Sequence, residues 1–593
     1  MRIAIALILC ATPALLLAVE APKQPPAWIA VSNGYTNTLL DVQLNHSPET
    51  GSRQGIAKFD ALITKPSLTD EKIERQELEA ALAKLKTARA KETDKKVLQD
   101  LDILRTAFEL QFRTQDYDWK HEVPYLNASS IIFGGLRGLL DDQVSAARWP
   151  AALARLNKYA GVENGYQPFT ELLQQYTSDQ MAKPGVVFPS KAEIETQLGR
   201  NSNYLSGISD LFIQHQLTGW QTAFQKLKGQ LTAYDQWVRT NLLPRARIDF
   251  RLAPEKYALA FEGYGIDIPP AQVAAMAHIA FTQYQAEMAP LAAQVAIANH
   301  YASSDYRSVI SELKKQQITG EAILPFFEKR LKEIERIVAT NNLVTLPDRP
   351  AIIRLATPAE TAQQPAPHMV PPAFLHNTGQ RGAFVLPLNI PSATGGAADK
   401  YDDFTYDAVA WTLTAHEARP GHELQFDSMV EQGVSLARSM FAFNSTNAEG
   451  WGLYAEYIMQ PFEPAEGQLL TLQLRLLRAA RAILDPELQS GKVTTQQAYD
   501  MLEKDVMLSH AFAKEEVERF TFEAPGQANS YFYGYTRILS LRKETEAALG
   551  KQFDQKKFHD FLLGQGLLPP NLMRNAVLED FIPNGLSGAH RGN

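Results

Sequence analysis

The chain has 593 residues, with 58 Lys and Arg against 66 Asp and Glu, for a net charge of -8. There is no basic excess for neutralising phosphates, which argues against nucleic acid as a partner. Cys10 is the only cysteine, so a mature chain that begins beyond it would have no thiolate, and any metal must be held by His, Asp and Glu.

The first 21 residues are typical of a secretory signal peptide. Arg2 supplies the positive charge, the stretch from Ile3 to Val19 is almost wholly apolar, and Ala18 and Ala21 are alternative cleavage points. We therefore expect a periplasmic or secreted protein.

Two features of this leader argue against a membrane-attached protein. Pro13 interrupts the apolar run and Glu20 closes it early, which disfavours an uncleaved anchor. A lipoprotein signal needs a small residue just before its cysteine, and Leu9 is not small. We expect neither lipidation at Cys10 nor stable membrane insertion after cleavage.

Helical periodicity dominates the next 320 residues or so, and strand-like alternation is scarce. We predict a mainly α-helical fold, with an N-terminal helical lobe over residues 22–345 and a C-terminal catalytic lobe over residues 346–593. Helices are predicted over 68 to about 115, 151–159, 191–217, 220–242, 270–298 and 308–339.

The composition changes near residue 345. Five prolines between 358 and 372 predict an extended connection. Residues 382–389 form the clearest strand, which Pro387 demotes to an edge strand. Such an edge could bind a peptide by strand addition or be an ordinary sheet edge. Residues 391–400, with two glycines, form a loop that could cover a cleft.

The most informative segment is His416-Glu417-Ala-Arg-Pro-Gly-His422. Two imidazoles beside a glutamate are typical of a catalytic zinc site, but there the histidines are usually four residues apart on one helical face. Six residues on a straight helix rotate by about 600°, which leaves the second ring roughly 120° from the first.

Pro420 and Gly421 offer a way around this spacing. Proline disfavours helical geometry at the preceding residue, and glycine accepts backbone angles that other residues avoid. The helix can break there, so that His422 swings back toward His416. The alternative is a helix that ends at Pro-Gly, with two histidines in ordinary surroundings.

A zinc ion held by two histidines needs a carboxylate to complete its shell, and Glu449 is the best candidate. Glu417 can act as general base toward the attacking water without binding the metal. Glu456 lies seven residues beyond Glu449, on the same helical face. One of these two carboxylates can bind the metal while the other hydrogen-bonds a ligand imidazole, or Glu456 is merely solvated. Glu423 and Gln425 follow His422 and could also approach the site.

Further along, Arg478, Arg481 and Asp485 share a helix, and surface ion pairing is the default interpretation. Tyr531 could donate a hydrogen bond to an oxyanion, and Arg519 could bind a substrate carboxylate. The alternative for Tyr531 and its neighbouring tyrosines is simple packing.

Five segments together resemble the bacterial domain-of-unknown-function 885 family. They are H-E-A-R-P-G-H-E-L-Q from residue 416, E-G-W-G-L-Y-A-E from 449, R-A-A-R-A-I-L-D from 478, E-V-E-R-F from 516 and P-G-Q-A-N-S-Y-F-Y-G from 525. The resemblance covers roughly residues 375 to 542. Two positions depart from the family pattern: Gln489 replaces a histidine, and Phe520 stands where tyrosine is common.

The family in turn resembles the helical gluzincin peptidases, such as angiotensin-converting enzyme, thimet oligopeptidase and carboxypeptidase Taq. That likeness implies a mostly α-helical body with a deep cleft, a Zn²⁺ cofactor and peptide substrates. Together with the strand at 382–389, we expect a large two-lobed helical body with a small edge sheet near the metal. The likeness implicates His416, His422 and Glu449 as zinc ligands and Glu417 as base, with Arg519 and Tyr531 around them.

The sequence thus favours a secreted or periplasmic zinc-dependent peptidase that acts on short peptides. A zinc amidase acting on a cell-wall fragment or another non-peptide amide is the second hypothesis. The third is a helical periplasmic binding or scaffolding protein with a degenerate site, to which Gln489 lends weight.

Overall fold

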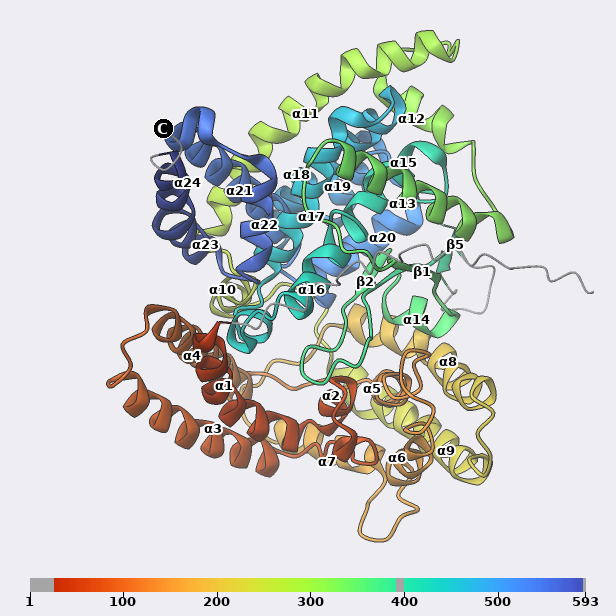
Figure 1. Ribbon diagram of the computed structural model, residues 1–593. Coiled ribbons are helices and arrows are strands. Elements are labelled where there is room, and N and C mark those ends of the chain that lie inside the picture. The colour runs from red at the N-terminus through yellow and green to blue at the C-terminus, as the bar shows by residue number, and fades with distance from the viewer. Residues whose placement is uncertain (1–25, 391–398, 401, 590–593) are drawn as a thin grey trace, which may run out of the picture.

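The computed structural model describes residues 26–390, 399, 400 and 402–589. The predicted signal peptide and residues 391–398 of the predicted loop lie outside these ranges. The prediction of a mainly α-helical fold is confirmed (Figure 1). No helix within the described ranges combines the length and the apolar composition needed to cross a membrane.

The first ten helices form the red-to-yellow part of the molecule in Figure 1. Apolar residues of α5 to α9 bury one another in a common core that includes Phe133, Leu156 and Ile208. The helices are α1 (Ala27–His46), α2 (Pro48–Arg53), α3 (Leu68–Arg89), α4 (Lys95–His121), α5 (Ala128–Arg137), α6 (Ala151–Tyr159), α7 (Phe169–Met181), α8 (Lys191–Gln214), α9 (Gln221–Trp237) and α10 (Pro254–Gly263).

The green-to-blue part is built around α18 (Ala465–Gln489), which is buried along almost its whole length. Around it lie α11 (Pro270–Ala298), α12 (Tyr306–Lys314), α13 (Ile323–Thr340), α15 (Asp407–Glu417), α16 (His422–Glu431), α17 (Ser445–Met459), α19 (Thr495–Asp500), α20 (His510–Glu518), α21 (Asn529–Leu549), α22 (Gln555–Gly564), α23 (Pro570–Ala576) and α24 (Ile582–Ala589). Helices α11 to α13 share a core with α15, α18 and α20, so the chain on both sides of residue 345 contributes to one core.

The helix predictions match the structure closely at 151–159 and 270–298, which are α6 and α11. The predicted stretch 308–339 is two helices, α12 and α13, because a turn containing Gly320 at a φ of 61° separates them. The region from 68 to 115 likewise contains two helices, α3 and α4.

A three-stranded sheet has the order β1-β3-β2, where β1 is Ile352–Leu355, β2 is His368–Val370 and β3 is Ala383–Leu386. Strand β3 pairs in parallel with β1 and antiparallel with β2, so its prediction as an edge strand was wrong. Pro387 comes directly after the strand and therefore removes no hydrogen bond from its ladder. Two further short strands pair with each other, β4 (Asn389–Ile390) and β5 (Asp399–Lys400).

The prediction of an extended connection over residues 358–372 was wrong for part of the segment. Residues Pro358–Gln363 form the short helix α14, which packs beside α8 (Figure 1). Pro358 occupies the first helical turn, where its missing N–H costs nothing, and Thr357 and Glu360 form a reciprocal capping box.

Candidate metal centre and active site

The predicted helix break is present. Helix α15 ends at Glu417 and α16 begins at His422, and the linker leaves helical geometry at Ala418 (φ -101°, ψ -104°) and Gly421 (φ -80°, ψ -131°). A Cβ at Gly421 would lie 1.9 Å from the carbonyl oxygen of His416, so only glycine fits this close approach. The break allows the His416 and His422 rings to meet with centroids 4.7 Å apart.

Contacts on both sides hold the linker in place. Trp451 donates from Nε1 to the carbonyl of Pro420 at 3.0 Å. Arg419 is buried and bonds Glu335 at 2.6 Å and Glu423 at 2.8 Å. The position of His422 therefore depends on packing from α13 and α17 as well as on the linker itself.

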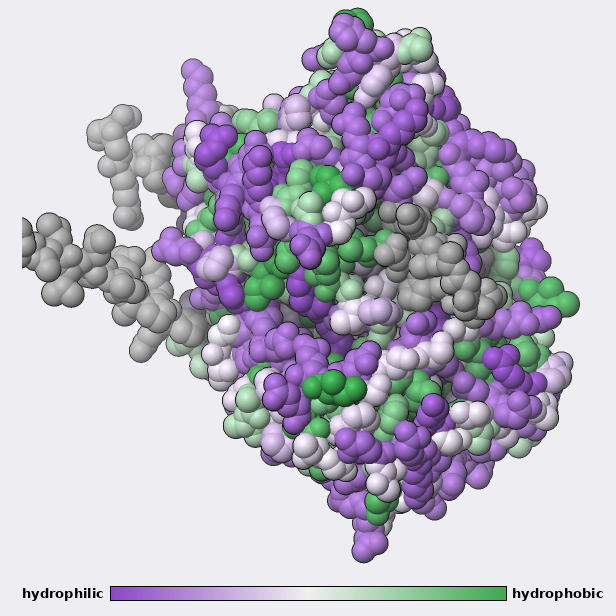
Figure 2. Space-filling model, turned by 90° about the vertical axis from the view of Figure 1, so that its right-hand side faces the viewer, coloured by the Kyte–Doolittle hydropathy of each residue, from purple (hydrophilic) through white to green (hydrophobic). Residues whose placement is uncertain are grey.

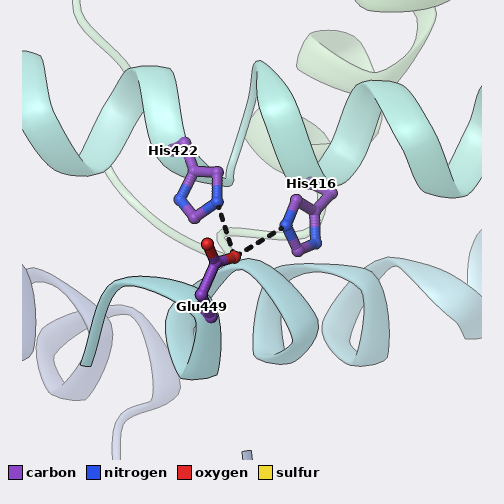
Figure 3. A group of neighbouring side chains, drawn as sticks. All are labelled: His416, His422 and Glu449. Carbon is purple, nitrogen blue, oxygen red and sulfur yellow. Dashed lines mark hydrogen bonds and ion pairs between the residues drawn. The ribbon is translucent and has the colours of Figure 1, made fainter. Parts of the chain in front are cut away.

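His416, His422 and Glu449 converge as predicted for a metal site (Figure 3). One ligand atom from each can be chosen so that all three lie within 4.8 Å of one another. Nε2 of His422 lies 3.3 Å from Oε2 of Glu449, and Nε2 of His416 lies 3.5 Å from the same oxygen. The two imidazoles thus face one carboxylate from separate helices, with the carboxylate on α17.

Glu456 lies behind His416. Its Oε1 is 2.7 Å from Nδ1 of His416, and Nη2 of Arg478 lies 3.3 Å from the same oxygen. The alternative that Glu456 is merely solvated was wrong, because the residue is 1% exposed. With Nδ1 donating to Glu456, Nε2 of His416 keeps its lone pair for a ligand on the Glu449 side.

Electrostatics at His416 favour positive charge. Burial lowers the pKa of an imidazole, but hydrogen bonds with Glu449 and Glu456 outweigh it and raise the pKa of His416 to about 9. The pKa of Glu449 lies well below its usual range, because the bonds from His416 and His422 outweigh burial. The site thus demands a cation, which a proton or a divalent metal can supply.

Two glycines of α17 let the site assemble at close range. A Cβ at Gly452 would lie 2.5 Å from Cε1 of His416, so the ring packs directly on the helix backbone. Two residues earlier, a Cβ at Gly450 would lie 2.6 Å from the backbone of Gly534 in α21. Helices α17 and α21 cross in direct backbone contact, which brings Tyr531 close to His416.

Glu417 lines the same pocket, with Oε1 4.0 Å from Nε2 of His416. Burial raises its pKa, and the nearby imidazoles only partly offset this effect. A carboxylate with a raised pKa beside a metal position is a suitable general base.

Tyr531 and Arg519 lie on the other wall of the pocket. The Tyr531 ring stacks near His416 with centroids 6.4 Å apart, and its hydroxyl lies 3.4 Å from Nη1 of Arg519. Burial and the charge of Glu449 raise the pKa of Tyr531, so the hydroxyl keeps its proton and can donate it in a hydrogen bond. Arg519 begins a π-helical turn, Arg519–Glu523, a local geometry that often marks functional sites.

Arg478, Arg481 and Asp485 are buried, so their interpretation as surface ion pairs was wrong. Arg481 makes two 2.6 Å bonds to Glu516, and its guanidinium lies 4.5 Å from the centre of the Tyr531 ring. Asp485 accepts hydrogen bonds from the hydroxyl of Tyr257 and the backbone N–H of Gly526.

The pocket has a volume of about 260 Å³. Sequence reasoning missed part of its lining. His368 and Met369 of β2 contribute, although nothing in their local sequence pointed to the site, and Phe426, Phe443 and Leu474 add apolar surface. The face of the molecule in Figure 2 is hollowed near its middle, with hydrophobic residues gathered along the hollow.

Three residues considered from the sequence are engaged elsewhere. Glu423 pairs with Arg349 and Arg419, and Gln425 donates to Asn447 at 3.0 Å. Gln489 bonds the backbone carbonyl of Phe520 and the backbone N–H of Leu252. None of the three lines the pocket.

A protein-family model described as "Bacterial protein of unknown function (DUF885)" matches residues 48–577. The chain belongs to this family. The match extends well beyond the 375 to 542 region in which the sequence motifs were recognised. A comparison with curated proteins found no match.

Two solved structures share the fold of this DUF885 protein. The "putative lipoprotein of unknown function" from Shewanella oneidensis has a TM-score of 0.68 at 20% identity, over 92% of this chain and 99% of that one. The "putative lipoprotein" from Colwellia psychrerythraea has a TM-score of 0.71 at 18% identity, over 94% and 98%.

Proposed function

We propose that this protein is a secreted or periplasmic zinc-dependent peptidase that hydrolyses short peptides. The observation that carries the proposal is the convergence of His416, His422 and Glu449 across a broken helix, with Glu456 behind His416 and Glu417 beside it. Two imidazoles and one carboxylate with an adjacent pocket are the donor set of a catalytic zinc site, which leaves a coordination position open.

The residues present fit a zinc ion. Nitrogen and carboxylate oxygen are donors that zinc accepts, and the second ring nitrogen of His416 is fixed by Glu456, as is usual for a metal-binding imidazole. Nδ1 of His422 is buried without a hydrogen-bond partner among the described residues, so the ring is held by packing. When bound, zinc supplies a Lewis acid that polarises the scissile carbonyl and acidifies water.

Glu417 is the proposed proton carrier. Its raised pKa suits it to take a proton from the attacking water and to deliver that proton to the leaving amine. Because it is buried, little bulk water screens its interaction with the reacting atoms.

Tyr531 is the proposed hydrogen-bond donor to the oxyanion that develops on the substrate. Arg519 lies beside the hydroxyl and can itself donate to it, which leaves the hydroxyl proton directed toward the substrate. The likeness to gluzincin peptidases, inferred from the sequence motifs, supports the same assignment of roles.

Export is proposed from the leader sequence. The two similar structures are described as lipoproteins, a class of exported proteins, which supports this location. The third hypothesis, a degenerate binding protein, drew on Gln489. That residue bonds backbone groups outside the pocket, so its identity removes no group from the pocket lining.

Hydrolysis of a peptide library by the zinc-loaded protein tests the proposal. We expect cleavage by the wild type and a loss of at least about 1,000-fold in Glu417→Gln, which removes the base while keeping the shape. His510→Ala, a change at an exposed histidine that does not line the pocket, is the matched control and should keep full activity. Cleavage of non-peptide amides but not of peptides would favour the amidase hypothesis, and equal activity of Glu417→Gln would refute both.

A further inference from the structure

Three buried or nearly buried arginines line one wall of the pocket: Arg478, Arg481 and Arg519. Arginine is the side chain best suited to bind a carboxylate through two parallel hydrogen bonds. The first question is which of the three has donors to spare.

Arg481 already has a carboxylate partner, because Glu516 accepts from its Nε and Nη2 at 2.6 Å each. Arg478 bonds the carbonyl of Leu474 at 3.1 Å and Glu456 at 3.3 Å. Its Nε has no hydrogen-bond partner among the described residues, but this atom is buried and so is not offered to a ligand in the pocket.

Arg519 differs from both. Its Nη2 lies 3.4 Å from Glu515 and 3.5 Å from Glu516, and its Nη1 meets the neutral oxygens of Gln527 and Tyr531 at 3.4 Å each. Charge-assisted hydrogen bonds are normally about 2.7–2.9 Å long, so the 3.4 Å contact with the neutral oxygen of Gln527 is a weak use of one Nη1 proton. That proton can turn to a carboxylate while the other keeps its contact with Tyr531. The side chain is 15% exposed and lines the pocket.

The spacing between Tyr531 and Arg519 then limits the substrate. If the Tyr531 hydroxyl donates to the scissile carbonyl, a carboxylate on Nη1 of Arg519 binds close beside it, since the two groups are 3.4 Å apart. One residue of extended chain spans about 3.3–3.6 Å. The geometry points to a single residue between the scissile bond and the bound carboxylate.

We propose that Arg519 binds the free C-terminal carboxylate of the substrate, and that the enzyme is a carboxypeptidase that releases one residue at a time. This inference rests on the proposed peptidase function and on the role of Tyr531 within it. The small pocket agrees with it, because about 260 Å³ is below the usual size of ligand pockets and leaves little room beyond the last residue.

The test uses the zinc-loaded wild type and three N-acylated peptides that differ only at the last residue. They are a free C-terminal acid, its C-terminal amide, and an amide in which the last residue is replaced by glutamate. We expect the free acid to be cleaved with a kcat/KM about 10 to 100 times that of either amide, with one amino acid released. The third peptide separates a terminal carboxylate from an acidic side chain.

Variants then assign the preference to Arg519. Arg519→Gln should raise KM for the free acid and bring the acid-to-amide ratio close to one, whereas Arg519→Lys should restore part of it. Arg200→Gln is the matched control, because Arg200 bonds Glu518 and Glu523 on either side of Arg519 and does not line the pocket. Glu417→Gln with zinc bound should still bind the free acid more tightly than the amide in calorimetry.

Equal cleavage of acid and amide by the wild type, internal cleavage, or the same loss of preference in Arg200→Gln would overturn the inference while leaving the peptidase proposal intact. Rapid cleavage of the glutamate amide would show that Arg519 binds an acidic side chain and not the terminal carboxylate. That result would also overturn the inference. Failure to cleave any peptide would instead refute the peptidase proposal itself.

Discussion

Nδ1 of His416 and Oε1 of Glu456 lie 2.7 Å apart although 40 residues separate them in the chain. The contact joins the end of α15 to the last turn of α17, and it fixes the ring so that Nε2 faces Glu449. The candidate ligands come from three helices, α15, α16 and α17, so no single helix determines how the imidazole is turned.

The first prediction concerns this link. Glu456→Gln removes the charge that holds the His416 ring, and we expect zinc affinity to fall about 10- to 100-fold while zinc can still bind. Competition with a chromophoric chelator measures the change. Glu463→Gln is the control: burial raises the pKa of Glu463 to about 8, so the native side chain is already neutral at pH 7. A similar loss of affinity in both variants would contradict the account.

Gly452 provides a second test. A methyl group there would lie 2.5 Å from Cε1 of His416 and push the ring out of position. We expect Gly452→Ala to lower kcat/KM about 100-fold, the cost of a misplacement of roughly 1 Å. Gly229→Ala, in α9, is matched because nothing lies within 4 Å of its added Cβ, and it should leave activity unchanged. Full activity of Gly452→Ala would show that the close packing is not needed.

The buried pair of Arg481 and Glu516 predicts a large effect on stability. Glu516→Gln leaves Arg481 with one acceptor oxygen instead of two and without its counter-charge, and we expect the free energy of unfolding to drop by about 3–5 kcal/mol. Glu544→Gln, which breaks the more exposed pair with Arg574, should cost far less, because water screens that pair. Urea denaturation distinguishes the two, and equal losses would argue against a structural role for the buried pair.

Because of His559, we expect the free energy of unfolding to fall in acid. The His559 ring is buried, accepts a bond from the Tyr454 hydroxyl and donates to the carbonyl of Leu343, and burial lowers its pKa to about 4. The unfolded chain, with an ordinary pKa of 6.5, therefore binds the proton more readily than the folded chain. The contribution of His559 to the free energy of unfolding is fully present above pH 6.5. It decreases by on the order of 3 kcal/mol as the pH falls toward 4.

Urea unfolding at pH 7 and pH 4.5 measures this contribution. The wild type should lose more stability over that interval than His559→Gln, which carries no titrating group at this position. The reverse order would mean that the histidine is charged in the folded state.

The convergence of His416, His422 and Glu449 could be predicted from the sequence because its signals are local. The Pro-Gly break between His416 and His422 and the single helical face of Glu449 and Glu456 both follow from backbone rules that hold before any tertiary packing. The capping box of Thr357 and Glu360 is also a local sequence pattern. The prolines around it favoured an extended segment instead, so the helix was not predicted.

What could not be predicted depends on which elements meet. Arg478 and Arg481 have the composition of a surface helix face, and only the burial of α18 on all sides places them inside. His368 reaches the pocket because β2 pairs with β3, a contact across 17 residues that carries no pattern of its own. The central position of β3 likewise depends on β1, which lies about 30 residues earlier.

The metal content of the purified protein tests the central claim most directly. After removal of metal with a chelator and reconstitution with zinc, elemental analysis should find one zinc per chain in the wild type, Glu417→Gln and His510→Ala, and a clear loss in His416→Ala. Absence of stoichiometric zinc in the wild type, or equal occupancy in His416→Ala, would contradict the assignment of His416, His422 and Glu449 as the metal ligands.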